Sequence, residues 1–580
     1  MRKWALAALG VLLIAAGGWY AHSVQTTGGI DVREVHFPGA GGVTMSGLLY
    51  VPATATAAAK APGILAVHGY INTKEAQDGF AIEFARRGYV VLAMDQRGHG
   101  ASGGAAFTGG FGGPDGLKYL RALPMVDTDN IGLEGHSMGG WTVLAAASAM
   151  PDGYRAMVLE GSSTGAPFAA DGTPAWPRNL AVIYSRYDEF APLMWGVPKA
   201  ADVGQGAKLK ALFGTRTPVV ENGLYGSIEA GTARILHQPP VTHPGDHISH
   251  AAIGHALDWF AQTLKGGTPR PSTDQVWFGK EAGTAIALIG FVTLVLGAFN
   301  GLLSLPVFAD LPQAPAPVRT KRDAGWWTAL LLTAFLPIVT FYPLMNAGMA
   351  TALMPSALKA LWPQLITNDI LLWALVGAVL TLVINAVTRA PKPTPRSPIL
   401  SAWFIAILCV AIGYGALLAS DALFKTDFRF WVVGLRLLTP AQALHAAAYL
   451  PLFFVFFWVT LRALHANLAV AGDGWIAQYA TGKMALAAGF VALLILQYGA
   501  LFATGHLLVP AGGPAAAIMG AQSMALNTII AIQFYPLMAT IGVVAVFCWR
   551  RTGTALPGAA LCSLLVTWYI VAGTATQLAG

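Results

Sequence analysis

The chain has 580 residues, too many for one ordinary domain, and only 11% of them are charged. So low a charged fraction indicates a membrane protein. The net charge of +7 arises in the second half, because residues 1–276 carry 20 basic and 21 acidic residues whereas residues 277–580 carry 15 and 7. Those basic residues lie between apolar runs, which indicates membrane topology rather than a nucleic-acid-binding face.

Neither the cysteines nor any short motif indicates a disulfide framework, a metal or a cofactor. Cys409, Cys548 and Cys562 all lie in apolar runs of the second half. The first half therefore has no disulfide framework. The sequence contains no metal-ligand spacing, no phosphate-binding loop and no nucleic-acid-binding module, so we expect no metal, no cofactor and no nucleic-acid partner.

The N-terminus carries an apolar segment after two basic residues. Arg2 and Lys3 precede an uncharged run of 18 residues, Trp4 to Ala21, which is near the lower limit for a membrane span. Residues 21–23 make a poor signal-peptidase site, which favours an uncleaved anchor at residues 1–24 over a cleaved signal peptide. Either interpretation sends the following segment out of the cytoplasm, because the two basic residues stay inside.

Residues 30–265 alternate between strand-like and helix-like runs. The strand-like runs are 43–51, 63–67, 89–94, 131–134, 156–160, 180–185 and 233–237, and the helix-like runs are 80–87, 114–123, 141–149 and 249–264. Strands that alternate with helices imply a mostly parallel, doubly wound sheet.

One strand-turn-helix junction carries a serine between glycines. Gly135-His136-Ser137-Met138-Gly139 lies between an apolar strand-like run and a helix-like run. A sharp turn at this point needs glycine on both sides of the serine, because a Cβ there would collide with the adjoining strand or helix. The turn presents the hydroxyl of Ser137 at a helix N-terminus, so we expect Ser137 to be a nucleophile rather than a helix cap.

These motifs resemble those of the α/β-hydrolase superfamily over roughly residues 30–265. The matching residues are His68-Gly69, Asp95-x-Arg97-Gly98-x-Gly100-x-Ser102, Gly135-x-Ser137-x-Gly139, and an Asp and a His that follow the last two strands. Leu48–Pro52 is similar to the dienelactone-hydrolase and prolyl-oligopeptidase-like branch. The resemblance implies the α/β-hydrolase fold and a Ser-His-Asp triad.

Asp188 is the expected acid of that triad. It follows the strand-like run 180–185 directly, and catalytic residues of open α/β sheets collect at the carboxyl ends of the strands. A carboxylate there can fix the tautomer of a histidine and stabilise its protonated form. Glu160 and Glu189 are the alternative acids.

Three histidines are candidates for the base: His243, His247 and His250. Ser249 is predicted to cap the last helix, so His250 should lie in its first turn. His243 has enough loop to return over the sheet and fits the resemblance best, with His247 as the alternative. The backbone N–H of Met138, at the helix N-terminus, can help to hold an oxyanion, and the resemblance implies that the N–H of Tyr70 is the second donor. His136 points sideways from the turn, so we expect it to have a packing role. An insertion at 190–232 is interpreted as a partial lid or pocket wall, or as a small core of its own.

The second half contains eight further apolar spans after a linker at 266–280. They lie at about 282–304, 325–345, 369–388, 399–420, 441–461, 484–508, 525–549 and 556–577, each close to the ~20 residues that a bilayer requires. The sixth and seventh of these spans are separated by a turn at Pro510–Pro514. The fold class expected is therefore an α/β-hydrolase domain followed by an all-α transmembrane bundle at 281–580.

The loop charges give the expected orientation. With Arg2 and Lys3 inside, twelve basic residues fall on the inner side, Lys392 and Arg396 among them, and four fall in the outer loops. By the positive-inside rule, this multi-pass protein of the plasma or inner membrane keeps the hydrolase-like domain outside the cytoplasm.

Taken together, the sequence predicts a membrane-anchored serine hydrolase that cleaves a small-molecule or lipid ester through an acyl-enzyme. Peptidase and acyltransferase activities of the same fold remain alternatives. A different class of function is a transporter or membrane scaffold with an accessory hydrolase-like domain. The expected partners are the ester substrate and the lipid bilayer, and the oligomeric state is left open.

Overall fold

The computed structural model describes residues 2–313, 317–345, 349–391, 398–508, 522–574 and 576–577. The chain forms two compact units. The first, here called the sheet unit, consists of Tyr20–Ala282, Tyr498–Ala525 and Gly573–Gly580. The second, the helical unit, consists of Met1–Trp19, Gly283–Gln497 and Leu526–Ala572. The sheet unit thus includes two short stretches from the far end of the sequence.

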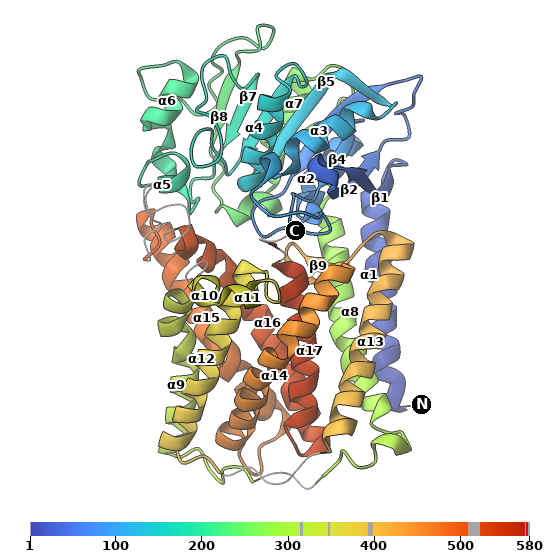
Figure 1. Cartoon of the computed structure of the whole chain (residues 1–580), viewed down its shortest axis with the longest axis vertical. Coiled ribbons are helices and arrows are strands. Elements are labelled where there is room, and N and C mark those ends of the chain that lie inside the picture. The colour runs from blue at the N-terminus through green and yellow to red at the C-terminus, as the bar shows by residue number, and fades with distance from the viewer. Residues whose placement is uncertain are drawn as a thin grey trace. The chain divides into compact units, whose positions relative to one another are not determined.

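An eight-stranded sheet forms the centre of the sheet unit (Figure 1). Its order is β1-β2-β4-β3-β5-β6-β7-β8. The strands are β1 (Asp31–Pro38), β2 (Thr44–Val51), β3 (Ala61–Val67), β4 (Val90–Met94), β5 (Val126–His136), β6 (Ala156–Glu160), β7 (Leu180–Ile183) and β8 (Arg234–His237). β1 and β2 are antiparallel to their neighbours, and the six others run parallel.

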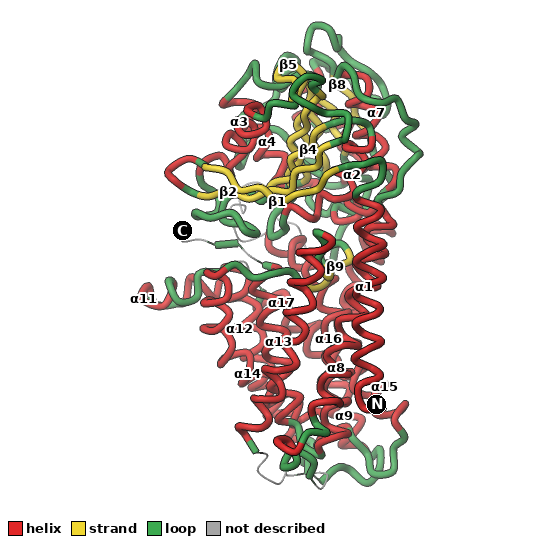
Figure 2. Tube along the Cα trace, turned by 90° about the vertical axis from the view of Figure 1, so that its right-hand side faces the viewer, coloured by secondary structure: helices red, strands yellow, loops and turns green. Residues whose placement is uncertain are grey.

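Helices cover both faces of this sheet. Figure 2 shows α3 (Gly113–Ala122) and α4 (Met138–Ala149) on one side of the strands, and α2 (Asp78–Arg86) and α7 (His250–Thr263) on the other. The core beneath α2 and α7 includes Phe84 and Phe260, whose ring centroids are 5.3 Å apart. The expected doubly wound sheet is therefore confirmed.

The structure adds one strand to those expected and extends another. β1 was missed by the sequence analysis, and it pairs with β2 along its whole length. β5 begins at Val126, five residues earlier than the expected run, and continues to His136. The Oγ of Ser249 accepts a hydrogen bond from the Ala252 N–H at 3.1 Å, which confirms the expected helix cap.

The insertion between β7 and β8 buries large apolar side chains. It contains α5 (Ala191–Met194) and α6 (Ala207–Phe213). Its side chains Trp195, Leu212 and Phe213 are buried. Burial of these large apolar groups stabilises the insertion, which agrees with the core interpretation.

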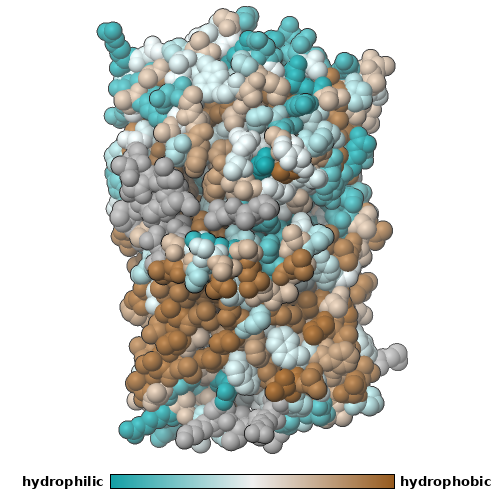
Figure 3. Space-filling model, in the orientation of Figure 1, coloured by the Kyte–Doolittle hydropathy of each residue, from teal (hydrophilic) through white to brown (hydrophobic). Residues whose placement is uncertain are grey.

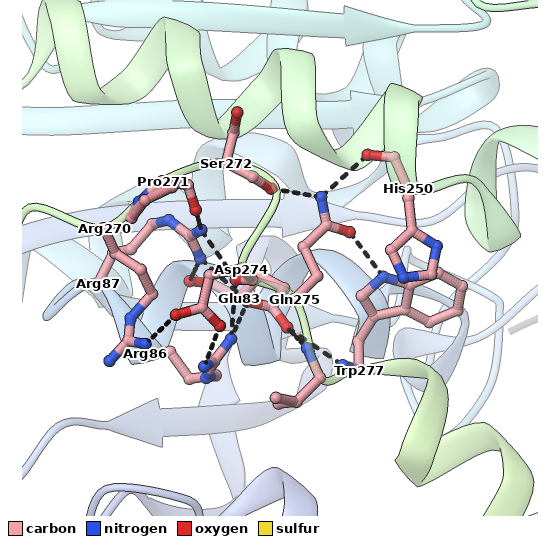
Figure 4. A network of polar contacts seen from close by, with 11 residues as sticks. Glu83, Arg86, Arg87, His250, Arg270, Pro271, Ser272, Asp274, Gln275 and Trp277 are labelled. Carbon is pink, nitrogen blue, oxygen red and sulfur yellow. Dashed lines mark hydrogen bonds and ion pairs between the residues drawn. The ribbon is translucent and has the colours of Figure 1, made fainter.

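The predicted linker at 266–280 is held against α2 (Figure 4). Arg86 of α2 donates to the Asp274 carboxylate at 2.9 Å. The carboxylate of Glu83 accepts hydrogen bonds from the backbone N–H groups of Val276 and Trp277, at 2.6 Å and 3.1 Å. These charge-assisted contacts fix the segment to the sheet unit.

Long apolar helices make up most of the other unit. Within the described residues, nine helices are long and apolar enough to cross a membrane, in agreement with the nine expected spans. They are α1 (Ala5–Gln25), α8 (Phe278–Leu302), α9 (Ala324–Leu344), α12 (Leu365–Val387), α13 (Ile399–Phe424), α14 (Pro440–Leu468), α15 (Trp475–Thr504), α16 (Gln522–Thr552) and α17 (Leu556–Gly573). Figure 3 shows the hydrophobic surface that such helices present.

Shorter elements connect some of these helices. They are α10 (Met349–Leu353), α11 (Ser356–Lys359) and a hairpin of β9 (Phe428–Phe430) and β10 (Val433–Leu435). The expected break at 510–514 and the loop charges Lys392 and Arg396 lie outside the described residues.

The turn at Ser137 has the strained backbone that its flanking glycines allow. Ser137 has φ of 54° and ψ of −120°, between the end of β5 and the start of α4. A Cβ on Gly135 would lie 2.3 Å from the carbonyl oxygen of Gly139, and a Cβ on Gly139 would lie 2.1 Å from that of Val67. Both approaches involve backbone atoms that cannot move aside, so glycine is required at both positions.

We expect Gly139→Ala to destabilise the sheet unit by about 1–3 kcal/mol, because the added methyl group overpacks the contact with β3. Thermal unfolding of the full chain in detergent measures the effect as a lower melting temperature. Gly254→Ala is the matched control, because Gly254 lies in α7 and a Cβ there would have its nearest contact at 3.5 Å. Equal melting temperatures for Gly139→Ala and the wild type would contradict this account of the turn.

Candidate active site

The backbone of Ser137 is anchored to the segment that follows β6. Its N–H donates to the carbonyl oxygen of Glu160 at 2.8 Å, and its own carbonyl accepts from the Ser162 hydroxyl at 2.6 Å. Two hydrogen bonds to neighbouring residues of one loop fix the direction in which the Ser137 side chain leaves the turn. The side chain lies at the carboxyl ends of the parallel strands, the edge at which open α/β sheets bind ligands.

Asp188 and His243 form a buried pair. Nδ1 of His243 lies 2.7 Å from Oδ2 of Asp188. The other carboxylate oxygen of Asp188 accepts from the Tyr184 hydroxyl at 3.0 Å and from the Phe190 N–H at 2.7 Å. Three donors therefore surround a carboxylate that is only 3% exposed, which is what a buried negative charge requires.

Gly161 places the His243 ring beside the serine turn. Gly161 has a positive φ of 53°, and a Cβ on it would lie 2.9 Å from Nδ1 of His243. Its two neighbours are Glu160 and Ser162, the residues that hold the Ser137 backbone. The structure thus pairs His243 with Asp188 and places the His243 ring next to Gly161, between the two residues that bind the Ser137 backbone; the assembly of all three into a triad stays a prediction.

The two other candidate histidines lie elsewhere. The His247 ring is 4.0 Å from the ring of His136 and meets the backbone of Ala76, not Asp188. Burial lowers the pKa of His247 to about 3, so its imidazole is neutral. His250 is the first residue of α7, as expected, and its ring packs on Trp277.

The alternative acids do not contact the His243 ring nitrogens. Both carboxyl oxygens of Glu160 are buried, and no hydrogen bond to them occurs within the described part of the chain. Burial, reinforced by Asp246 and Glu134, raises the pKa of Glu160 well above its usual range, which keeps it neutral. Glu189 accepts a hydrogen bond from the backbone N–H of His243, at 2.8 Å, rather than from the ring.

His243 differs electrostatically from the histidines around it. Burial alone lowers the pKa of His243, but the hydrogen-bonded Asp188 carboxylate, with smaller contributions from Glu189 and Asp246, raises it, and the net shift is upward. Burial lowers the pKa of His136 well below the usual range, with His247 and His243 adding to the effect. His243 is therefore the histidine of this group that can gain a proton and have its charge balanced.

The expected oxyanion donors lie on either side of the serine. Met138 is the first residue of α4, where a backbone N–H has no partner within the helix ladder. Tyr70 follows Gly69, and a Cβ on Gly69 would lie 3.1 Å from the Cβ of Ser137. Both residues are thus adjacent to Ser137 in the chain or in space, and their role as oxyanion donors stays a prediction.

Several contacts at this site involve residues that the sequence analysis did not assign. His136 does more than pack, because its Nε2–H donates to the carbonyl oxygen of His243 at 3.0 Å. The Tyr498 hydroxyl donates to Glu189 at 2.8 Å. The backbone of Gln577 exchanges hydrogen bonds with Gly98 and Ala106, at 3.0 Å and 2.8 Å. No sequence signal connects residues so far apart in the chain.

Acidic, histidine and cysteine side chains do not gather into a metal site. In the ranges that the structure describes, no group of three or more such residues is placed to hold a metal ion. The three cysteines are buried thiols.

The first half of the chain matches a known family. The model described as serine aminopeptidase, S33 (Hydrolase_4) matches residues 59–192. A monoacylglycerol lipase of Mycolicibacterium smegmatis is 32% identical over 221 residues, which cover 36% of this chain and 71% of the relative.

Two solved structures show more distant similarity. The α/β hydrolase GrgF from Penicillium sp. sh18 is 15% identical, with a TM-score of 0.30. The match covers 41% of this chain and 100% of GrgF. A hypothetical protein, PA2218, from Pseudomonas aeruginosa is 26% identical, with a TM-score of 0.21. The match covers 22% of this chain and 42% of the length of the Pseudomonas protein. On the sequence match to the mycobacterial relative and the order of the sheet, the chain belongs to the α/β-hydrolase family, with its serine aminopeptidase S33 domain in the N-terminal half.

Proposed function

We propose that the chain is a membrane-bound serine hydrolase that cleaves an ester through an acyl-enzyme on Ser137. The observation that carries the proposal is the 2.7 Å pair of His243 and Asp188 beside a serine on a strained turn. A serine hydroxyl is a weak nucleophile by itself and needs an adjacent base. His243 supplies that base, and Asp188 fixes its tautomer.

The reaction would proceed in two halves. Ser137 Oγ attacks the ester carbonyl while Nε2 of His243 takes its proton, and the oxyanion accepts hydrogen bonds from the N–H groups of Tyr70 and Met138. His243 then gives the proton to the departing alcohol, which leaves an acyl-serine. In the second half, water loses a proton to His243 and attacks the acyl-serine carbonyl. The bond from the acyl carbon to Ser137 Oγ then breaks, His243 returns the proton to Oγ, and the acid is released.

The substrate we propose is an ester with an apolar acyl chain. Aromatic side chains lie next to Tyr70, the proposed oxyanion residue, whose ring centroid is 5.5 Å from that of Phe107. Phe168 stacks on Phe107 at 5.9 Å, and its ring is tilted against that of Trp141 at 5.1 Å. Such a group of rings favours an apolar ligand over a charged one. The lipase activity in the name of the mycobacterial relative supports the same class.

Amide cleavage is the second candidate, because the matched family model is described as an aminopeptidase. The same triad and oxyanion donors serve both ester and amide substrates. A comparison of matched ester and amide substrates on the full chain distinguishes the two.

We further propose that the hydrolase domain lies outside the cytoplasm. The support is the distribution of basic residues, twelve of which fall in inner loops and four in outer loops when Arg2 and Lys3 are inside. The nine long apolar helices among the described residues supply the spans that this topology needs.

Ser137→Ala tests the reaction and the sidedness together. A membrane-impermeant fluorophosphonate should label the wild type on intact cells and should not label the variant, since the probe bonds to the activated serine Oγ. Ester hydrolysis should fall by about 10⁴-fold or more. Labelling that persists in Ser137→Ala would refute the nucleophile, and labelling that requires broken cells would refute the orientation.

His243→Ala and His247→Ala separate the two candidate bases. We expect the first to lower kcat by about 10³-fold or more, because the proton on Ser137 then has no acceptor. The second should leave kcat within a few-fold of the wild type, since His247 does not touch Asp188. The reverse order of effects would assign the base to His247.

The pH profile of kcat/KM reports the state of His243. Only neutral His243 can accept the proton, so the rate should fall as the pH decreases through the pKa of this residue. Because the Asp188 carboxylate raises the pKa of His243 against the effect of burial, the acidic limb should have its midpoint above the usual histidine pKa of about 6.5. Full activity well below pH 6 would be incompatible with this electrostatic arrangement.

A further inference from the structure

Glu189 connects the proposed base to a residue from the far end of the chain. It follows Asp188 on the loop after β7, and its side chain is only 3% exposed. Oε2 of Glu189 accepts from the backbone N–H of His243 at 2.8 Å. Oε1 accepts from the hydroxyl of Tyr498, also at 2.8 Å. One carboxylate thus receives a donor from each of two segments that are remote in sequence.

α15 contacts the loop after β7 at two residues, Tyr498 and Phe502. Tyr498 and Phe502 are four residues apart on α15, so their side chains lie on the same face of the helix. The ring of Phe502 meets that of Tyr187 edge to face, with centroids 5.0 Å apart. Tyr187 lies two residues before Glu189. The hydrogen bond is therefore reinforced by an aromatic contact to the same loop.

The backbone of His243 is held on both sides. Its N–H donates to Glu189, and its carbonyl oxygen accepts from Nε2 of His136 at 3.0 Å. Asp188 holds the ring through Nδ1. Asp188 consequently sets the orientation of the imidazole, whereas Glu189 and His136 set the position of the backbone that carries it.

The hydrogen bonds at Glu189 offset the cost of burying its charge. Burial raises the pKa of Glu189 to about 7, and the adjacent Asp188 carboxylate adds to that rise. The hydrogen bonds from His243 and Tyr498 act in the opposite direction, because they favour the ionised form. Loss of the Tyr498 hydroxyl would leave one buried oxygen of this carboxyl group without that donor, and a buried polar group without a partner is costly.

We propose that Tyr498 is a positioning residue of the hydrolase, which acts through Glu189 to hold the backbone of the base His243. The inference rests on the proposed function, since it assigns a role within that same site. Tyr498 belongs to the compact sheet unit although it lies on α15, 309 residues after Glu189. The second half of the chain thereby contributes a group to the active site and is not only an anchor.

The test is Tyr498→Phe in the full chain in detergent, which removes the hydroxyl and keeps the ring. We expect kcat for a water-soluble ester to fall by about 10-fold or more with KM nearly unchanged, because a displaced base weakens the transition state and not substrate binding. The rate constant of fluorophosphonate labelling should fall by a similar factor. Tyr479→Phe is the matched control, since Tyr479 lies on the same helix but in the helical unit.

Variants of Glu189 provide a rescue experiment. Glu189→Gln keeps a carbonyl oxygen for the His243 N–H and a polar group facing Tyr498, whereas Glu189→Ala keeps neither. We expect Gln to retain several-fold more kcat than Ala. Glu189→Ala combined with Tyr498→Phe should be no slower than Glu189→Ala alone, because the hydroxyl acts only through the carboxyl group.

Three outcomes would overturn the inference. If Tyr498→Phe is labelled as fast as the wild type and Tyr479→Phe, the hydroxyl does not position the base. If only the amount of labelled protein falls, at an unchanged rate constant, Tyr498 serves stability alone. If the wild type is itself not labelled at Ser137, the proposed function fails, and the inference fails with it. Labelled wild type with an unaffected Tyr498→Phe would refute the inference but leave the proposed function intact.

Discussion

The hydrogen bond between Asp188 and His243 is the interaction on which the other features of the site depend. It is 2.7 Å long and is enclosed by protein on all sides, since both side chains are at least 94% buried. A charged carboxylate in such a place is tolerated only if donors surround it, and Tyr184 and Phe190 supply two more. The pair is therefore satisfied before any substrate arrives, which preorganises the base.

The other buried ionisable groups near the pair are arranged so that they do not compete with it. Burial raises the pKa of Glu134 to about 8 and that of Glu160 well above its usual range, and it lowers that of His247 to about 3. These groups are consequently neutral near pH 7. Gln77 donates to both carboxyl oxygens of Glu134, at 2.9 Å and 2.7 Å. Asp188 is the carboxylate that forms a hydrogen bond to the imidazole of His243.

The sequence predicts those parts of the fold that local chemistry determines. The glycines around Ser137 identify the turn, because only glycine fits where a Cβ would meet backbone atoms at 2.1–2.3 Å. The alternation of strands and helices along the chain predicts the doubly wound sheet, because each helix returns the chain to start the next parallel strand. β1 was missed because its residues are mostly exposed or half-buried, so an edge strand of this kind lacks an apolar signal.

The choice between His243 and His247 and the role of His136 depend on long-range contacts that sequence patterns do not reveal. His243 and His247 precede the same helix cap, and their spacing does not say which ring meets Asp188; the contact of His247 with the Ala76 backbone depends on a loop far away in sequence. In the same way, the motif around Ser137 gives no sign that His136 holds the carbonyl of His243. Local patterns therefore single out the proposed nucleophile Ser137, whereas the choice of His243 as the proposed base follows from packing.

The segments that make up the sheet unit differ from the range that sequence patterns predict for the hydrolase domain. All eight strands of its sheet lie within the expected range 30–265, yet the unit also includes Tyr498–Ala525 and Gly573–Gly580. Tyr498 donates to Glu189, and the backbone of Gln577 bonds to the loop that carries Gly98 and Ala106. A chain cut after α7 would lose these donors and acceptors, and the groups left behind would be buried polar atoms without partners or would have to rearrange. The range suggested by sequence patterns therefore leaves out hydrogen-bonding partners of the sheet unit that lie on α15 and after α17.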